Sequence, residues 1–447
     1  MVGNNKCAYK IPYTKNSNDA LGLASKGSVS VIKKQVAVIG AGASGLFFGY
    51  SFVKENHDLV IIDHMNGPGK KLRLCGGGQC NLTHAGSIKD FLPMYYEKGK
   101  AIRKLLYKYS NQLMMDDLQK NGLPLVCRQD GKVFPKAMSS DAVINFLVAA
   151  IQRGGGQLVY DQQLTDITVM DSSCLSKGHN NNSSFRYCLS FQSGMEVHCN
   201  FIVLGCGGRT FTQTGSDASI LNVLSMYNQI KFTKCRQGLA PIYTDQFPFK
   251  DLAGVVIDPV TCQVLDKEGR VLGTETGPLL FNGRCFSGPC ILHLSRFARD
   301  GYTLKINYLS ATRVKDPSSW AKTAAMEMNQ SKKSLASFGQ DKYKLPRSFL
   351  KIMEMLFPTP SQFATNLVSH KLTITNANNF KTGMITCGGI DLDCLNLNTM
   401  EIKGMDGVYA IGELVDVDGK SGGYNLQWAF SSGFAAANSI NSVLSKL

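Results

Sequence analysis

The sequence predicts an α/β protein in which both ends of the chain build one sheet-and-helix domain and the middle builds two further units. A strand–glycine–helix pattern stands at Val36–Val53, and a second one closes the chain at 407–438. Between them the composition changes from glycine-rich to strand-rich and then to lysine-rich. The expected divisions are a flexible tail at 1–34, a discontinuous α/β domain at 35–212 and 386–447, an inserted β-barrel-like domain at 213–310 and 361–385, and a helical subdomain at 311–360.

The composition indicates an ordinary globular protein with a basic surface. Residues 1–34 are polar and pattern-free, and their scarcity of acids leaves an organelle transit peptide open. The 14 cysteines include no C-x-x-C pair and no paired Cys/His cluster, so we expect free thiols and no metal site. The sequence shows no secretory signal, and we expect a cytoplasmic location.

A net charge of +15 points to an anionic partner, with nucleic acid first. Basic residues cluster at Lys70–Arg73, Lys98–Lys108 and Lys332–Lys351. The uncharged stretch Val36–Val53 approaches the length of a membrane span, but its glycines and serines argue against one. We therefore expect no membrane contact.

A glycine loop follows the first apolar strand. It reads GAGASG over residues 40–45, the G-x-G-x-x-G spacing of dinucleotide-binding domains, and an uncharged helix follows. Gly40 permits the tight turn, Gly42 lets the backbone approach a pyrophosphate, and Gly45 lets the helix pack close to the strand. The next strand ends in Asp63, 23 residues after Gly40, where a carboxylate accepts the ribose hydroxyl of an adenosine.

A second glycine cluster, KKLRLCGGGQCNLTH, occupies residues 70–84. Three consecutive glycines have no side chain to pack, so they serve a positive φ or the close approach of backbone to a flat group. Cys75 and Cys80 flank them with the spacing of a redox pair beside a flavin.

The final block, 407–438, favours FAD over NAD, because a dinucleotide domain completed by the end of the chain is typical of flavoproteins. Gly412 and Glu413, with Asp416, can supply the acid that holds the ribityl chain. The segment 422–425 can open a helix whose positive end stabilises the anionic reduced flavin. The residues assigned to FAD from all these segments are Gly40, Gly42, Ala43, Ser44, Gly45, Asp63, Lys71, Gly76, Gly77, Gly78, Asn81, Gly207, Gly208, Gly412, Glu413, Asp416, Gly422, Gly423, Asn425 and Gln427.

The order of these motifs resembles a known family. The GAGASG loop, GGGQCNLTH at 76–84, TGPLLFNGRCFSGPCIL at 276–292 and TMEIKGMDGVYAIGELVDVDGKSGGYNLQWAFSSG at 399–433 are similar to segments of the BaiN/RdsA or aminoacetone oxidase family, over about residues 35–447. The resemblance implies a Rossmann-like FAD-binding domain with a β-barrel-like insert and a helical subdomain. It also implies activities that include reduction of activated C=C bonds, bile-acid reduction, amine oxidation and dihydrouridine formation in ribosomal RNA.

This chain departs from the family pattern Ser-Gly-Gly-Gly-Arg-Cys-Asn-x-Thr-Asn at three positions. Cys75 stands for the serine, Gln79 for the arginine and His84 for the last asparagine. Loss of the arginine removes a fixed cation near the flavin or the substrate.

We therefore expect an FAD-dependent oxidoreductase that takes hydride from NAD(P)H and passes it to an activated double bond. Uridine in ribosomal RNA is the leading substrate, and a small molecule is the other. Cys80 and His84 are the candidates for the acid that protonates the neighbouring carbon. Amine oxidation, thiol–disulfide reduction and a non-catalytic RNA-binding flavoprotein stay open as alternatives.

Overall fold

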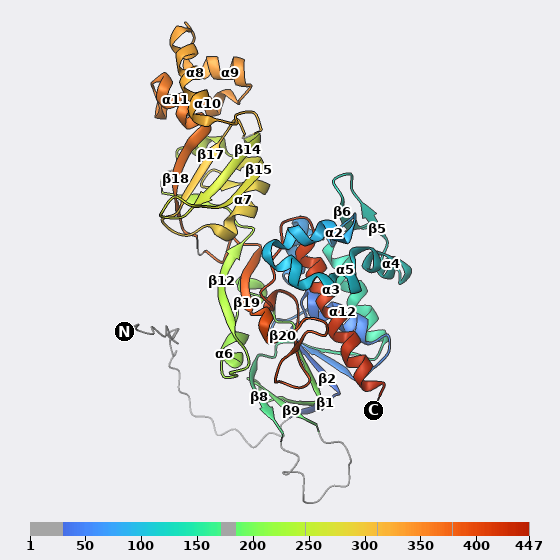
Figure 1. Ribbon diagram of the computed structural model, residues 1–447. Coiled ribbons are helices and arrows are strands. Elements are labelled where there is room, and N and C mark those ends of the chain that lie inside the picture. The colour runs from blue at the N-terminus through green and yellow to red at the C-terminus, as the bar shows by residue number, and fades with distance from the viewer. Residues whose placement is uncertain (1–29, 171–184, 246, 311, 378, 447) are drawn as a thin grey trace, which may run out of the picture.

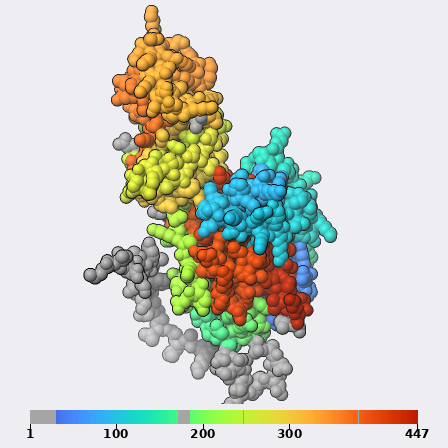
Figure 2. Space-filling view, viewed as in Figure 1, coloured from blue at the N-terminus to red at the C-terminus, as the bar shows by residue number. Residues whose placement is uncertain are grey.

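The computed structural model describes residues 30–170, 185–245, 247–310, 312–377 and 379–446. These residues form two bodies, which Figure 1 shows one above the other and Figure 2 shows as two lobes. The lower body contains both the blue N-terminal and the red C-terminal segments, and the upper body contains the yellow and orange ones. Both ends of the described chain therefore share one body, as the two strand–glycine–helix patterns predict.

A seven-stranded sheet forms the centre of the lower body. The five strands from β22 to β7 pair in parallel. Strands β2, β3 and β11 are apolar and buried along their whole length, as strands covered on both faces must be. In spatial order the strands are β20 (Leu395–Asn396), β21 (Glu401–Ile402), β22 (Val408–Ala410), β11 (Phe201–Leu204), β2 (Val36–Ile39), β3 (Leu59–Ile62) and β7 (Gln157–Val159).

The strand order reverses between β2 and β11. The chain runs from β2 outward through β3 to β7, and then crosses to the other side of β2 to form β11. In open parallel sheets, ligands bind in the crevice beyond the carboxyl ends of the strands at such a reversal. The glycine loop after β2 and the glycines after β11 meet here, and the Gly205 N–H donates to the Ile39 carbonyl at 2.8 Å.

Helices α1 (Ala43–Phe52) and α5 (Ser140–Arg153) pack on this sheet, and α12 (Tyr424–Leu444) packs on α1. Helix α1 also packs against α5. A Cβ at Gly433 of α12 would lie 2.9 Å from the Ser44 carbonyl oxygen, so glycine permits the close approach of α12 to α1. The first residues of α1 and of α12 both line the crevice.

The predicted tail ends earlier than expected. Val31–Lys33 form strand β1, which pairs in parallel with β10 (Glu196–Cys199). The bound at 34 is therefore wrong, because residues 30–34 belong to the lower body, and a three-residue edge strand is too short to show an alternating pattern. The rest of the expected tail, 1–29, lies outside the described residues.

Smaller elements complete the lower body. Sheet β1-β10-β9-β8 lies beneath the central sheet, and a three-stranded sheet, β4-β6-β5, contains a hairpin formed by β5 and β6. The bounds not yet given are β4 (Thr83–His84), β5 (Leu125–Cys127), β6 (Lys132–Pro135), β8 (Leu164–Val169), β9 (Tyr187–Phe191), α2 (Ile88–Phe91), α3 (Gly99–Lys108), α4 (Asn111–Lys120), α6 (Ile220–Leu224), and the 3₁₀ helices η1 (Leu72–Gly78), η2 (Leu92–Lys98), η4 (Thr212–Thr214), η7 (Leu392–Cys394) and η8 (Gly412–Leu414).

A six-stranded antiparallel sheet and five α-helices form the described part of the upper body. An isolated bridge between Ile242 and Phe286 brings the two edges of the sheet together, so the sheet nearly closes on itself. In spatial order the strands are β13 (Tyr243–Thr244), β18 (His370–Thr375), β17 (Thr303–Asn307), β14 (Val256–Leu265), β15 (Val271–Phe281) and β16 (Phe286–Ser287), and the helices are α7 (Pro289–Leu294), α8 (Pro317–Gln330), α9 (Leu335–Tyr343), α10 (Arg347–Leu356) and α11 (Pro360–Ser369), with 3₁₀ turns η5 (Lys250–Leu252) and η6 (Ser295–Phe297).

Each body has its own hydrophobic core. The second core begins at Ile242 and ends at Ala377. Helix α6 and Ile230, which fall inside the insert expected from residue 213, pack in the first core instead. The helical segment shares the second core with the β-sheet through residues such as Phe349.

The two bodies are joined by an antiparallel ribbon. Strand β12 (Phe232–Gly238) leads into the upper body, and β19 (Ile385–Ile390) leads back, and the two pair with each other. Figure 1 shows them side by side between the bodies. The ribbon places the upper body beside the crevice of the lower one.

Candidate active site

The glycine loop after β2 divides its glycines between packing and ligand approach. A Cβ at Gly40 would lie 2.5 Å from the Gly205 carbonyl oxygen, and one at Gly45 would lie 1.9 Å from the Gly40 carbonyl oxygen. A Cβ at Gly42 would meet nothing closer than 4.0 Å. Gly40 and Gly45 therefore let the chain pack on itself, whereas Gly42 leaves open space at the wall of the crevice.

Helix α1 begins at this loop without a side-chain cap. Gly42 is its N-cap, and its first turn contains no acidic residue. Its first N–H groups and the positive end of its dipole thus remain available for an anion, as a pyrophosphate requires.

Asp63 lies where the ribose of an adenosine is expected. Its Oδ2 accepts a hydrogen bond from the Ala41 N–H at 2.6 Å, and its Oδ1 accepts one from the Met65 N–H at 2.8 Å. These two bonds fix the carboxylate at the end of β3, on the wall of the crevice. Each oxygen keeps a lone pair for a further donor such as a hydroxyl.

The crevice is a cavity of about 570 Å³, within the range of cofactor sites. Fourteen of the residues assigned to FAD line it: Gly40, Gly42, Ala43, Ser44, Asp63, Lys71, Gly76, Gly77, Asn81, Gly207, Glu413, Gly422, Gly423 and Asn425. The other six do not line it: Gly45, Gly78, Gly208, Gly412, Asp416 and Gln427.

Lys71 and Glu413 form an ion pair on the cavity wall. Lys71 Nζ lies 2.7 Å from Glu413 Oε2, and Glu413 Oε1 accepts from the Thr386 N–H at 2.8 Å. A Cβ at Gly208 would lie 2.2 Å from Thr386 Oγ1 and 2.8 Å from Glu413 Oε1. Gly208 therefore makes room for the carboxylate and need not touch a ligand itself.

Asp416 has a different place from the one expected. Its Oδ2 accepts from Lys98 Nζ at 2.9 Å, and its Oδ1 accepts from the Gly388 N–H at 3.0 Å. The side chain is buried away from the cavity. Of the two predicted acids, only Glu413 can reach a ribityl chain.

The start of α12 is held against the 76–84 segment. A Cβ at Gly423, the N-cap, would lie 2.5 Å from the Thr83 carbonyl carbon, so only glycine fits. Gln427 is fully buried, and its Oε1 accepts from Thr83 Oγ1 at 2.7 Å. Gln427 therefore ties two segments together, and the uncapped helix start faces the cavity.

The triple-glycine turn has the conformation that its composition predicts. Gly76, Gly77 and Gly78 have φ values of 58°, 65° and 87°. Cys75, just before them, lines the cavity, whereas Cys80, just after them, is fully buried behind it. The Cys80 thiol donates to the Cys75 sulfur, which lowers the pKa of Cys75 against the effect of burial. The same contact and burial raise the pKa of Cys80.

Neither predicted acid lines the cavity. Cys80 has no exposed surface. The His84 ring stacks on Tyr424 at 5.7 Å, and its two nitrogens bond to the carbonyl oxygens of Ala85 and Asp130. In this geometry His84 is engaged in packing.

Arg128 places a cation beside Gln79, the position at which the family pattern has arginine. Arg128, from the β5–β6 hairpin, donates to Gln79 Oε1 at 2.8 Å and stacks on Phe134 at 4.1 Å. Arg128, Gln79 and Lys132 all line the cavity. A guanidinium therefore lies at this wall although the family arginine is absent from the glycine segment.

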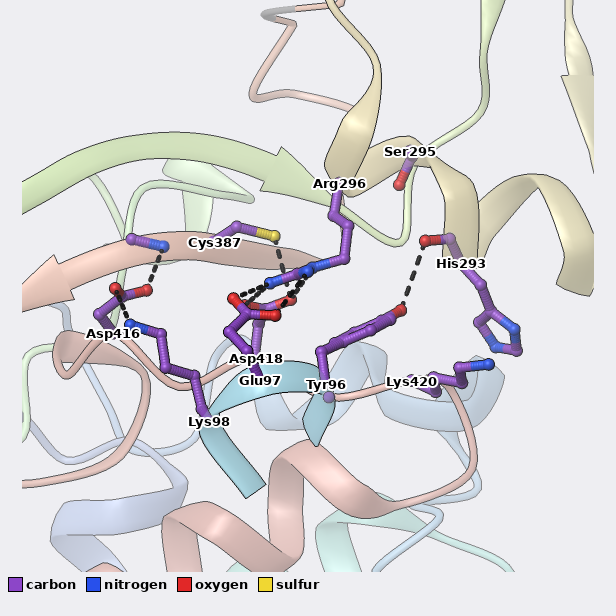
Figure 3. Close-up of polar contacts among 12 residues, drawn as sticks. Tyr96, Glu97, Lys98, His293, Ser295, Arg296, Cys387, Asp416, Asp418 and Lys420 are labelled. Carbon is purple, nitrogen blue, oxygen red and sulfur yellow. Dashed lines mark hydrogen bonds and ion pairs between the residues drawn. The ribbon is translucent and has the colours of Figure 1, made fainter. Parts of the chain in front are cut away.

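A cluster of charged side chains, which we call the junction cluster, joins the two bodies beside the cavity (Figure 3). Arg296 of the upper body bonds to Asp418 at 2.9 Å and to Glu97 at 3.0 Å. Lys420 bonds to Glu275 at 2.6 Å. No short segment of the sequence predicts these contacts, because they join residues far apart in the chain. The cluster comprises Tyr96, Glu97, Lys98, Glu275, His293, Arg296, Asp416, Asp418 and Lys420.

One group on the outer sheet has the composition of a metal site. Cys188, Glu196 and His198 bring ligand atoms within 4.8 Å of one another. Pairing of β9 with β10 sets His198 opposite Cys188, which no short sequence spacing reveals. None of the three lines the cavity.

Among the described helices, none is both long enough and apolar enough to cross a membrane.

The reversed parallel sheet, the glycine loop, the Asp63 carboxylate at the end of β3 and the second helix start are typical of a dinucleotide-binding flavoprotein of the Rossmann type. The chain matches the profile of the HI0933-like protein Rossmann domain over residues 34–439, and it belongs to that family. It is an FAD-dependent oxidoreductase.

Relatives with assigned activities align over nearly the whole chain. The ribosomal RNA dihydrouridine synthase of Escherichia coli is 25% identical over 422 residues, which cover 90% of this chain and 97% of the relative. The 3-dehydro-bile acid delta(4,6)-reductase of Clostridium scindens is 24% identical over 419 residues, which cover 90% and 98%.

Among solved structures, a flavocytochrome c3 fumarate reductase is 13% identical with a TM-score of 0.48 and covers 92% of this chain and 78% of its own. A 3-ketosteroid delta1-dehydrogenase from Sterolibacterium denitrificans is 13% identical with a TM-score of 0.49 and covers 92% and 100%.

Proposed function

We propose that this enzyme uses NAD(P)H as the electron donor to reduce an activated C=C bond, with uridine in ribosomal RNA as the leading substrate. The observation that carries the proposal is the chemistry that the two named activities share. Both add a hydride and a proton across a C=C bond conjugated to a carbonyl group, and both relatives align over 90% of this chain.

The described residues fit the cofactor that this chemistry needs. When bound, FAD supplies two-electron hydride transfer. Gly42 and the start of α1 would hold the pyrophosphate, Asp63 the ribose, and Glu413 the ribityl chain. The start of α12 would face the flavin ring. A flat cofactor requires open space beside the backbone, and both Gly42 and Gly77 provide it. A Cβ at Gly77 would meet no atom within 4 Å, and one at Gly42 would meet its nearest atom at 4.0 Å.

The basic side chains of the wall favour an anionic or carbonyl-rich substrate. Arg128 and Lys132 line the cavity beside the triple-glycine turn. Their N–H groups can bond to uracil carbonyls or to the phosphates that flank the base. A base in folded RNA must be splayed out of its stack to enter such a cavity.

The test is to incubate the FAD-loaded enzyme with NADH or NADPH and an unmodified ribosomal RNA transcript without oxygen. We expect flavin reoxidation by the RNA and dihydrouridine in the digested product by mass spectrometry. RNA affinity should fall by orders of magnitude between about 50 and 200 mM salt, because phosphate contacts release counterions. If the transcript neither reoxidises the flavin nor gains dihydrouridine, RNA is not the substrate, and small enones become the substrates to test.

Contact between Cys75 and Cys80 supports thiol–disulfide reduction as a second candidate. The two sulfurs share a hydrogen bond, and Cys75 reaches the cavity. An exchange pair needs both sulfurs, so Cys75→Ser and Cys80→Ser should then abolish turnover equally. A C=C reductase should tolerate Cys75→Ser, because the family places serine there.

A further inference from the structure

Three polar side chains lie in a line from the cavity wall to the surface. Ser421 lines the cavity. Its Oγ lies 2.8 Å from His293 Nε2, and His293 Nδ1 lies 3.5 Å from Glu275 Oε2. The side chains of His293 and Glu275 are 15% and 18% exposed, so the line reaches solvent at its outer end.

This line exists only where the two bodies meet. Ser421 belongs to the loop before α12, whereas His293 lies in α7 and Glu275 in β15 of the upper body. Tyr96 Oη donates to the His293 carbonyl oxygen at 3.3 Å and so fixes the backbone of α7 against the lower body (Figure 3). The ribbon of β12 and β19 therefore brings a histidine to the back of the FAD cavity.

The orientation of the His293 ring follows from its partners. Both the N–H and the hydroxyl of Ser421 point at Nε2, at 3.3 and 2.8 Å, so Nε2 is the acceptor and the ring proton lies on Nδ1. Nδ1 then faces the Glu275 carboxylate. Burial acts to raise the pKa of Glu275, but its bonds to His293 and Lys420 hold that pKa below its usual value. Glu275 thus stays charged and can stabilise an imidazolium.

We propose that Ser421, His293 and Glu275 form a proton relay that exchanges one proton between solvent and the substrate in the cavity. This inference rests on the proposed C=C reduction. Ser421 is the catalytic group because it alone of the three lines the cavity. His293 and Glu275 act through it as positioning residues.

The reaction balances through this relay. The C=C bond gains a hydride at one carbon, which brings both electrons, and a proton at its neighbour. The Ser421 hydroxyl gives its proton to that neighbour while the imidazolium returns one from Nε2 to Ser421 Oγ. His293 is left neutral, with its remaining proton on Nδ1 as in the described structure, and regains a proton from solvent at its exposed edge.

A purely structural role would not require this arrangement. Arg296 already holds the two bodies together through its ion pairs with Asp418 and Glu97. Ser421 adds no charge to the junction, yet its hydroxyl bonds to a histidine and the residue itself lines the cavity. A serine–histidine–carboxylate line is the arrangement that activates hydroxyl groups for proton transfer in other enzymes.

The test compares Ser421→Ala and His293→Gln with the control Tyr96→Phe, which removes a junction contact to the backbone of α7 and leaves the relay side chains intact. The first half of the reaction is FAD reduction by NAD(P)H, and the second is reoxidation by 2-cyclohexen-1-one or by the RNA transcript. We expect normal FAD content and reduction in all three variants. Reoxidation should slow about 100-fold or more in the two relay variants and stay near the wild-type rate in the control.

The pH profile separates a relay from a docking contact. Charged and titratable groups facing His293 are Glu275, Lys420 and Tyr96, with Arg296 stacked on Tyr96. If His293 returns the proton to Ser421, reoxidation should slow at high pH, and His293→Gln should remove this limb of the profile.

A readout without substrate distinguishes failure of the relay from failure of the proposed function. The chain has seven histidines, so ¹⁵N-histidine labelling gives few signals, and His293→Gln identifies the one of interest. We expect Ser421→Ala to shift the Nε2 resonance of His293. If the enzyme reduces no alkene but shows this shift, the proposed function is wrong, whereas the hydrogen bond between Ser421 and His293 is confirmed. Relay variants with wild-type rates and pH limb, or an unmoved Nε2 resonance, would overturn the relay.

Discussion

The cavity wall and the junction cluster share one loop, 416–423, yet they are built by different means. At Gly42 and Gly77 the wall uses backbone and glycine, so that a cofactor can approach where a Cβ would obstruct it. The junction cluster uses long charged side chains that reach across two bodies, such as Arg296 to Asp418. A glycine requirement is local and shows in a short motif, whereas an ion pair between residues 122 positions apart shows only in the fold. The glycine, Arg296 and Glu97 variants below test how far this difference holds.

The largest expected effect separates two glycines of one loop. In Gly45→Val the side chain would collide with the Gly40 carbonyl oxygen, 1.9 Å from the new Cβ, so we expect loss of the folded lower body. In Gly42→Val the new side chain would enter the open cavity, so the protein should fold but lose FAD. Circular dichroism and flavin absorbance of the purified variants measure both outcomes. A yellow Gly42→Val at full occupancy would contradict the site.

Arg296→Met should cost about 3–5 kcal/mol of unfolding free energy, because it leaves Asp418 charged, unpaired and buried. The Asp418 side chain is 2% exposed. The matched control is the double variant Arg296→Met/Asp418→Leu, which removes both charges and should recover most of the loss. Equal destabilisation of the single and the double variant, measured by denaturant unfolding, would show that the charges are not what matters here.

The cysteine pair should show an intermediate effect on reactivity. The pKa of Cys75 is lowered by the thiol of Cys80, so iodoacetamide should alkylate Cys75 from a lower pH than it does an ordinary thiol. Cys80→Ala removes that hydrogen bond and should move the alkylation of Cys75 to higher pH. Buried Cys80 should resist alkylation in the folded protein. Peptide mass spectrometry of alkylated samples across pH measures all three, and faster labelling of Cys80 than of Cys75 would refute the assignment.

Glu97→Gln should have the smallest effect, at most about 1 kcal/mol, because exposed ion pairs contribute little. The Glu97 side chain is 61% exposed, although it bonds to the same guanidinium as Asp418. A thermal unfolding shift as large as that of Arg296→Met would show that the exposed partner, and not the buried one, holds the junction.

The parts predictable from sequence are those fixed within a short segment. GAGASG with Asp63, the triple glycine and the start of α12 pointed to part of the cavity wall, because each glycine answers a local demand. Lys420, Ser421 and Arg128 were missed, since their roles depend on partners such as His293 and Gln79 that only tertiary structure brings near. Asp416 was assigned to the cofactor because spacing along a loop does not tell which way a side chain turns, and Lys98 turns it away.

Closure of the cavity by both ends of the chain sets an order of events during synthesis. Its wall needs Gly40 and Ala429, and at about 5–20 residues per second the ribosome takes on the order of tens of seconds to pass from one to the other. The core of the upper body ends at Ala377 and is complete before α12 has been made. FAD capture is therefore a late event that follows folding of the upper body, and a chain cut short before α12 would carry a folded upper lobe and no flavin.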